Sequence, residues 1–102
     1  MDRSAVVQAW YDFVKEAHEK IRKAAHSHTQ LKITYESKGA TSVRYVEPYK
    51  FKPIKDKNGK EDVILYAYCK SKNAIRTFKL ENLKAIENTS LSFAPKWEIE
   101  IK

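Results

Sequence analysis

The sequence predicts an α+β, mainly β domain in which one N-terminal amphipathic helix packs on a small antiparallel barrel of five to six strands. Three observations lead to this fold class. Apolar residues recur every three or four positions as far as residue 25, and every second position from residue 31. Turn signals then separate about six short strands, which is typical of a small barrel rather than of a sheet with crossover helices. With 102 residues, the chain is expected to be a single domain, 1–102.

The first element is predicted to be a helix over residues 4–26. Its apolar stripe contains Val6, Val7, Trp10, Phe13, Val14, Ala17, Ile21, Ala24 and Ala25. This stripe can close one side of the barrel or dock a partner. Because a small barrel needs cover, we expect Trp10, Phe13, Val14 and Ile21 to be buried against it.

Two strands are predicted to follow the helix. Residues 31–35 alternate apolar and polar side chains, as expected for a strand with one face in the core. A turn at 38–41 leads into a second strand over residues 42–47. We expect Pro48 to end this strand, because proline has no N–H group for the hydrogen-bond ladder.

The later strands are predicted from a second turn and from apolar runs. Asn58-Gly59 is a strong signal for a tight turn. Residues 63–69 are continuously apolar or aromatic, which indicates a central strand buried on both faces. The remaining expected strands cover residues 74–80, about 85–89 and about 97–101.

The charge of the chain is concentrated in one segment. The net charge is +7, and residues 44–79 supply +6 of it, with 10 basic and 4 acidic side chains. A localised basic surface favours a polyanion as partner and steers it electrostatically. A lysine-rich surface that only keeps the domain soluble is the alternative, and charge alone leaves both interpretations open.

The motifs give no support for catalysis. Gly59-Lys60 lacks the upstream glycine and the following Ser or Thr of a phosphate-binding loop. His26 and His28 have no cluster of cysteines or carboxylates beside them that would complete a zinc site. We therefore expect a protein that is not an enzyme and that carries no cofactor and no metal. A single cysteine and the absence of a membrane-spanning apolar run predict a cytoplasmic location without membrane contact.

Binding of nucleic acid is better supported, since it needs cations for phosphates and flat rings for bases. The two types of side chain are interleaved in Arg44, Tyr45, Tyr49, Lys50, Phe51 and Lys52. The alternative is that the aromatic rings form the core, which we favour for Phe51, Tyr66 and Phe78. For Tyr35 and Tyr68 both interpretations stay open, because a phenol often keeps its polar end at a pocket.

Several landmarks occur in an order and spacing that resembles the WYL domain. They are Ile33-Thr34-Tyr35, Arg44 before Pro48, Leu65-Tyr66-Ala67-Tyr68-Cys69, Arg76-Thr77-Phe78-Lys79-Leu80, and Thr89 with Phe93. The resemblance implies an Sm-like (SH3-type) β-barrel that binds nucleic acid or nucleotide-like ligands and signals to a neighbouring domain. It also implies a module that often lies inside longer chains, such as bacterial helicases or transcription regulators.

The resemblance further implies a basic ligand pocket. In WYL domains a tyrosine and two arginines line this pocket, and the matching positions are Tyr35, Arg44 and Arg76. The triplet that names the family is Val63-Ile64-Leu65 in this chain, and a further family arginine is replaced by Asn82. The absence of an arginine at Asn82 favours an extended single strand over a small second messenger as the ligand.

The expected function is therefore that of a non-enzymatic accessory domain that binds single-stranded DNA or RNA. Arg44 and Arg76 are expected to hold phosphate, and Tyr35 and Tyr68 to stack on bases or to form hydrogen bonds. The expected helper residues are Lys50, Lys52 and Lys79. The alternatives are a regulatory domain that senses a nucleotide or short oligonucleotide, and a protein-interaction module that uses the helix stripe or a barrel edge.

Overall fold

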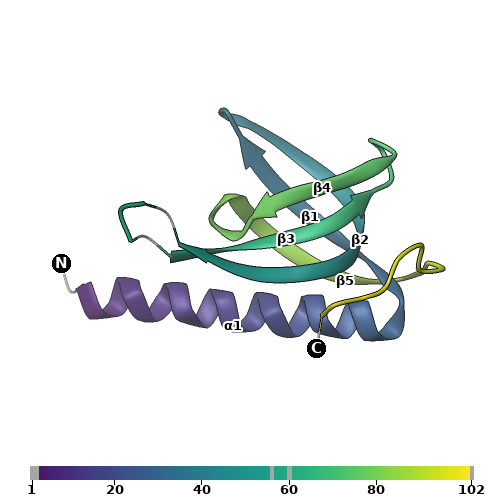
Figure 1. The fold of residues 1–102 in the computed structure, drawn as a ribbon. Coiled ribbons are helices and arrows are strands. Elements are labelled where there is room, and N and C mark those ends of the chain that lie inside the picture. The colour runs from purple at the N-terminus through teal and green to yellow at the C-terminus, as the bar shows by residue number, and fades with distance from the viewer. Residues whose placement is uncertain (1–2, 56, 60, 102) are drawn as a thin grey trace.

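The chain forms one long helix followed by five antiparallel strands, as the computed structural model in Figure 1 shows. The structure describes residues 3–55, 57–59 and 61–101. The elements are α1 (Arg3–Ser27), β1 (Thr29–Ser37), β2 (Ala40–Lys55), β3 (Glu61–Cys69), β4 (Ala74–Lys79), the short 3-10 helix η1 (Leu80–Asn82) and β5 (Leu83–Ser92). The predicted N-terminal helix and the mainly β character of the chain are thus confirmed.

The sheet has the strand order β4-β3-β2-β1-β5. It is strongly curved (Figure 1), yet in the described part of the chain no pairing joins its two edge strands, β4 and β5. The predicted closure into a barrel is therefore not shown. The prediction of a strand near 97–101 is wrong, because residues 93–101 have no regular secondary structure. One backbone hydrogen bond, from the Glu100 N–H to the Tyr49 carbonyl oxygen at 2.8 Å, attaches this segment to β2.

Pro48 does not end the second strand, contrary to the expectation. Strand β2 continues through it to Lys55 and changes partner on the way. The part up to Val46 pairs with β1, and the part from Val46 onward pairs with β3. A register shift lies between Pro48 and Lys50. A missing N–H is tolerated at such a bulge, where the pairing with β1 has already ended.

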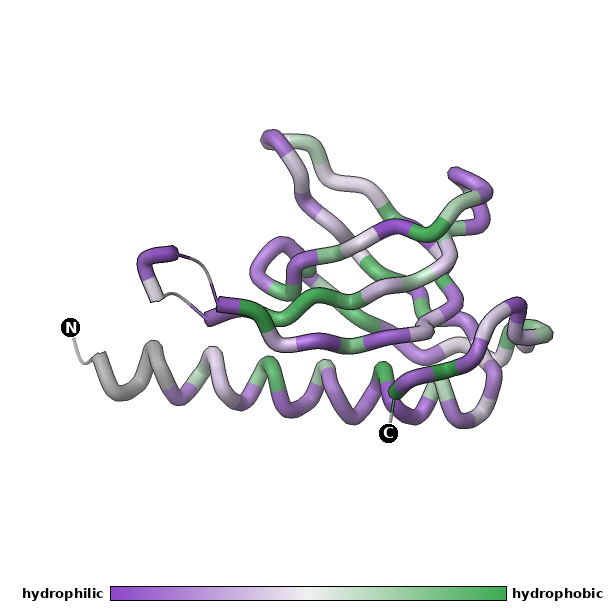
Figure 2. Tube along the Cα trace, in the orientation of Figure 1, coloured by the Kyte–Doolittle hydropathy of each residue, from purple (hydrophilic) through white to green (hydrophobic). Residues whose placement is uncertain are grey.

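The core lies between α1 and one face of the sheet, which we call the inner face. On the inner face, Leu31, Ile33, Val46, Leu65 and Phe78 are at most 1% exposed. Figure 2 shows that apolar residues recur along the side of α1 that lies toward the sheet. The buried residues of this helix side are Ala17, Ile21, Ala24 and Ala25. This part of the helix stripe is therefore core, and it is not free to dock a partner.

The burial predicted for the helix is confirmed for Ile21 and holds only in part for three other residues. Trp10, Phe13 and Val14 are half-buried and pack against the core from its margin. In Figure 1 the N-terminal half of α1 runs past the body of the sheet toward the β2–β3 turn. Fewer strands cover the helix there, which explains the incomplete burial.

Strand β3 is buried on one face only, not on both as its continuous apolar run predicted. Leu65, Ala67 and Cys69 are fully buried on the inner face. Ile64, Tyr66 and Tyr68 alternate with them and are half-buried on the opposite side, which we call the outer face. The sheet therefore presents two chemically distinct surfaces.

The turn between β1 and β2 depends on Gly39. Lys38 and Gly39 have φ values of 52° and 78°, as a tight two-residue hairpin turn requires. A Cβ atom on Gly39 would meet nothing within 4 Å, so a side chain there costs only conformational energy. We expect Gly39→Ala to lower the free energy of unfolding by about 1–2 kcal/mol in urea titrations.

The control for this prediction is Gly39→Asn. Asparagine adopts positive φ more readily than alanine, so this variant is expected to be more stable than Gly39→Ala. Equal stability of wild type and Gly39→Ala would show that the turn does not constrain the hairpin.

Within the part of the chain that the structure describes, α1 is too polar to span a membrane. The same residues contain no group of three or more His, Cys, Asp and Glu side chains that could hold a metal ion.

Candidate nucleic-acid interface

Three of the predicted site residues lie on the inner face of the sheet. Residues that pair across neighbouring strands share a face. Arg44 pairs with the buried Ile33, and Arg76 pairs with the buried Ala67. Tyr35 lies two residues after Ile33 on β1 and therefore points to the same side. The structure thus brings residues from three separate strands together on one face.

Phe78 is the centre of this arrangement. The Tyr35 ring contacts the Phe78 ring edge-on, with centroids 5.1 Å apart and an interplanar angle of 82°. The guanidinium carbon of Arg44 lies 5.8 Å from the centre of the same ring. Arg44 also donates a hydrogen bond from Nε to Ser42 Oγ, at 3.3 Å. We call Tyr35, Arg44, Arg76 and Phe78 the arginine cluster.

The arginine cluster is suited to an external anion. Arg44 is half-buried and held by its neighbours, whereas Arg76 is exposed on the edge strand β4. No ion pair found among the described residues involves either arginine. Two guanidinium groups on one face can bind a phosphate through paired hydrogen bonds, which a lysine cannot reproduce.

The only cysteine lies on the same face, beside the arginine cluster. Cys69 is fully buried. Burial raises the pKa of its thiol, but hydrogen bonds from Ser71 and from the Lys72 backbone, together with the Arg44 guanidinium, outweigh this effect. The pKa of Cys69 therefore lies below its ordinary value. The thiol has no access to solvent, so it serves as packing beneath Arg44.

The other predicted site residues lie on the outer face. Lys50 pairs with Tyr66, and Lys52 and Lys79 flank Ile64 from the two neighbouring strands. Tyr68 belongs to the same row of side chains as Tyr66. The seven residues that the sequence predicted as one binding face are therefore divided between the two sides of the sheet.

Tyr68 is less open than the sequence suggested. The Lys96 ammonium group lies 4.4 Å from the centre of its ring, and the Trp97 ring centre lies 6.0 Å away. The Tyr68 hydroxyl group donates a hydrogen bond to Asn73 Oδ1. The C-terminal segment thus packs on one part of the outer face, and a base could stack on Tyr68 only if that segment moved.

A buried carboxylate anchors the C-terminal segment, and sequence reasoning missed it. Glu47 is 1% exposed, and Lys96 donates hydrogen bonds from Nζ to both of its oxygens, at 3.2 and 3.3 Å. The Tyr49 hydroxyl group donates to the same carboxylate at 3.1 Å and accepts a hydrogen bond from the Lys96 backbone N–H at 2.9 Å. The only sequence signal was an acidic residue between the apolar Val46 and Pro48.

The pKa shifts agree with this geometry. Burial, together with the hydrogen bond to Glu47, raises the pKa of Tyr49 above its ordinary value. The hydrogen bond to Glu47 raises the pKa of Lys96 in the same way. At neutral pH, the ammonium group of Lys96 is therefore charged.

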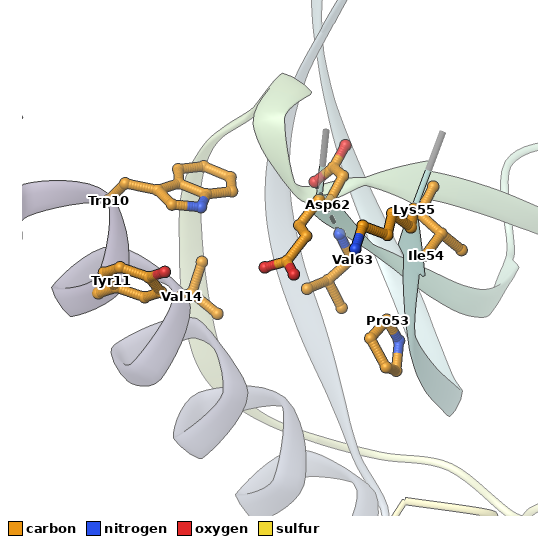
Figure 3. A pocket seen from close by; sticks show the side chains of 9 residues that line it. Trp10, Tyr11, Val14, Pro53, Ile54, Lys55, Asp62 and Val63 are labelled. Atoms are coloured by element: carbon orange, nitrogen blue, oxygen red, sulfur yellow. Dashed lines mark hydrogen bonds between the residues drawn. The ribbon is translucent and has the colours of Figure 1, made fainter. Parts of the chain in front are cut away.

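A pocket of about 340 Å³ lies between α1 and the β2–β3 hairpin (Figure 3). Trp10, Tyr11 and Val14 line it from the helix, and Pro53 and Val63 line it from the strands. None of the predicted site residues lines this pocket.

Comparisons with known proteins agree with the fold. The family model described as WYL domain matches residues 16–88. The solved structure of proteasome accessory factor B/C (PafBC) of Arthrobacter aurescens is similar, with a TM-score of 0.62 and 24% sequence identity. The match covers 76% of this chain and only 12% of PafBC. No curated protein sequence matches the chain.

Proposed function

We propose, because this chain belongs to the WYL domain family, that it is a non-catalytic regulatory module that binds single-stranded nucleic acid through its arginine cluster. The observation that carries the proposal is the pairing of Arg44 with Ile33 and of Arg76 with Ala67. This register directs both guanidinium groups to the face on which Tyr35 and Phe78 lie.

The expected chemistry follows from these side chains. Arg44 and Arg76 would hold phosphate oxygens by charge-assisted hydrogen bonds. The half-buried Tyr35 would offer its hydroxyl group or the rim of its ring to a base or sugar. These roles are recognition of phosphate and of a base or sugar, and none requires a nucleophile or a metal.

The likeness to a much longer protein supports a role as part of a larger assembly. This chain corresponds to 12% of PafBC, a protein whose name describes an accessory factor of the proteasome. We therefore propose that the module is accessory to a helicase or transcription-regulator domain and reports ligand binding to it.

A second candidate ligand is a nucleotide or a short oligonucleotide. The compactness of the arginine cluster favours it, because Tyr35 and Arg44 both contact the single ring of Phe78.

A titration distinguishes these ligands and tests the proposal. We expect labelled single strand to bind more tightly than duplex of equal length, because a stacking ring needs an unpaired base. Tyr35→Ala is expected to lose about 1–3 kcal/mol of binding free energy if the ring stacks on a base. Tyr35→Phe should lose much less. The measurement is fluorescence anisotropy at two salt concentrations.

Three outcomes of this titration are informative. Equal affinity for single strand and duplex would contradict stacking. A nucleotide that binds as tightly as the single strand would make the short ligand the true one. Full affinity in a folded Tyr35→Ala variant would remove the tyrosine from the site.

A further inference from the structure

We propose that the outer face of β2, β3 and β4 is a second nucleic-acid surface, on which Lys50, Lys52 and Lys79 hold phosphates of a single strand and Tyr66 stacks on a base. This inference deepens the proposed function, because it extends the same class of ligand to the other side of the sheet. The two surfaces share no residue, so variants can test the proposal for each surface independently.

The register places these four residues side by side. Lys50 and Tyr66 are direct partners on β2 and β3. Ile64 lies between Lys52 on β2 and Lys79 on β4. Neighbouring strands are about 4.8 Å apart, and alternate residues of one strand are about 7 Å apart. Lys50 is therefore the direct neighbour of Tyr66, and Lys52 and Lys79 are its diagonal neighbours, on a surface about as wide as three strands.

The outer face is basic where it is accessible. Lys52 and Lys79 are exposed, and Lys50 is half-buried. On the described parts of β2, β3 and β4, two carboxylates belong to the same face, and both are buried. Glu47 is 1% exposed and bound by Lys96, and Asp62 is 8% exposed. The exposed lysines of the β3–β4 turn, Lys70 and Lys72, extend the positive surface at one end.

Tyr66 is the aromatic residue that this face offers to a base. Its ring is half-buried, and the Lys50 ammonium group lies over it, 5.8 Å from the ring centre. Its neighbour Tyr68 is already in contact with Lys96 and Trp97. The contact of Lys50 with Tyr66 is longer than the 4.4 Å contact of Lys96 with Tyr68. Movement of the exposed end of Lys50 would open the Tyr66 ring to a base and leave the ammonium group beside the phosphate.

The edge strand β4 connects the two surfaces. Arg76 points to the inner face and Lys79 to the outer face of this short strand. In the described part of the chain, nothing pairs with the other edge of β4. A bound single strand can therefore pass from the arginine cluster across this edge and continue over Lys79 to Tyr66. A nucleotide is too short for this path.

The test compares two ligands, an oligothymidine of about 16 nucleotides and a thymidine dinucleotide. For the long ligand, the triple variant Lys50→Ala, Lys52→Ala, Lys79→Ala is expected to bind at least about tenfold more weakly. Its plot of log affinity against log salt should flatten by about two units, at about 0.7 for each released phosphate. Tyr66→Leu should weaken the long ligand about five- to hundredfold, whereas Tyr66→Phe should keep most of the affinity. The dinucleotide should bind with equal affinity to the wild-type protein, the triple variant and the two Tyr66 variants.

A matched control removes three cations from the helix instead. Lys15, Arg22 and Lys23 are exposed on α1, and their triple alanine variant has the same net charge as the outer-face variant. It is expected to keep nearly full affinity and salt dependence for the long ligand. An equal loss of affinity in both triple variants would show that only the overall charge matters. It would overturn the inference.

The remaining outcomes separate this inference from the proposed function. If the outer-face variant keeps wild-type affinity while loss of Arg44 and Arg76 abolishes binding, the proposed function stands and the second surface does not exist. If the outer-face variant alone loses the long ligand, the second surface stands and the arginine cluster is not the site. A long ligand that binds no tighter than the dinucleotide, or a duplex that binds as tightly as the single strand, would also overturn the inference.

Discussion

Replacement of both Arg44 and Arg76 by alanine is expected to abolish measurable binding of single-stranded nucleic acid at physiological salt. A hydrogen bond to a charged group contributes about 1.5–3 kcal/mol, which corresponds to roughly ten- to hundredfold in affinity for each arginine. The loss should be the same for every base sequence, because phosphate contacts carry no sequence information. The slope of log affinity against log salt should flatten by about 0.7 for each phosphate that loses its cation.

Two further variants make this result specific. The double variant with lysine at both positions should recover only part of the affinity, because a point charge lacks the paired donors of a guanidinium group. Arg22→Ala should change neither affinity nor slope, since Arg22 is exposed on α1. The proposed function fails if the folded double alanine variant binds single strand with unchanged affinity and slope.

Replacement of Phe78 by alanine is expected to have the largest effect on stability and to disable the site as well. The Phe78 side chain is 1% exposed and lies among buried residues of the core. Truncation of such a ring typically lowers the free energy of unfolding by about 3–5 kcal/mol. The same ring supports Tyr35 and Arg44, so both would lose the contact that orients them.

Phe78→Leu separates the two effects. Leucine keeps most of the buried apolar volume but has no ring for the Arg44 guanidinium group. We expect this variant to unfold at higher urea concentration than Phe78→Ala and to bind nucleic acid more weakly than wild type. Wild-type binding by Phe78→Leu would show that the arginine does not need the ring, and Phe78 would then serve the core alone.

The sequence predicted most of the elements because their signals are local. The three- to four-residue period of α1 and the turn residues Gly39 and Gly59 depend on neighbours in the chain. The prediction of where β2 ends was wrong because that boundary is not a local property. Pro48 blocks a ladder only where a partner strand needs its N–H, and the change of partner from β1 to β3 removes that need.

The candidate site was predicted in its residue types and not in its geometry. The alternation of side chains places Arg44 and Lys50 on the same side of an ideal strand, since they are an even number of residues apart. The extra residue at the bulge between Pro48 and Lys50 reverses this alternation and sends Lys50 to the outer face. The sequence carries no clear mark of that bulge, so one binding face was predicted where the sheet has two.

The contact between Glu47 and Lys96 could not be predicted for a related reason. An acidic residue within a strand usually points to solvent, and only the return of the C-terminal segment to β2 gives this one a buried partner. The sequence predicted a strand near 97–101, which assumed backbone pairing. The observed attachment combines one backbone hydrogen bond, from Glu100 to Tyr49, with contacts of the Tyr49 and Lys96 side chains.

The position of β1 between β2 and the edge strand β5 has a consequence for how the domain folds. Strand β1 pairs with its immediate successor β2 and also with β5, so that Leu31 lies opposite both Val46 and Asn88. Hairpins between consecutive strands can form early, whereas the β1–β5 ladder must close a loop that contains most of the sheet. During synthesis, one edge of β1 therefore stays open until nearly the whole domain has left the ribosome. We therefore expect the docking of β5 to be the slow step that completes the core.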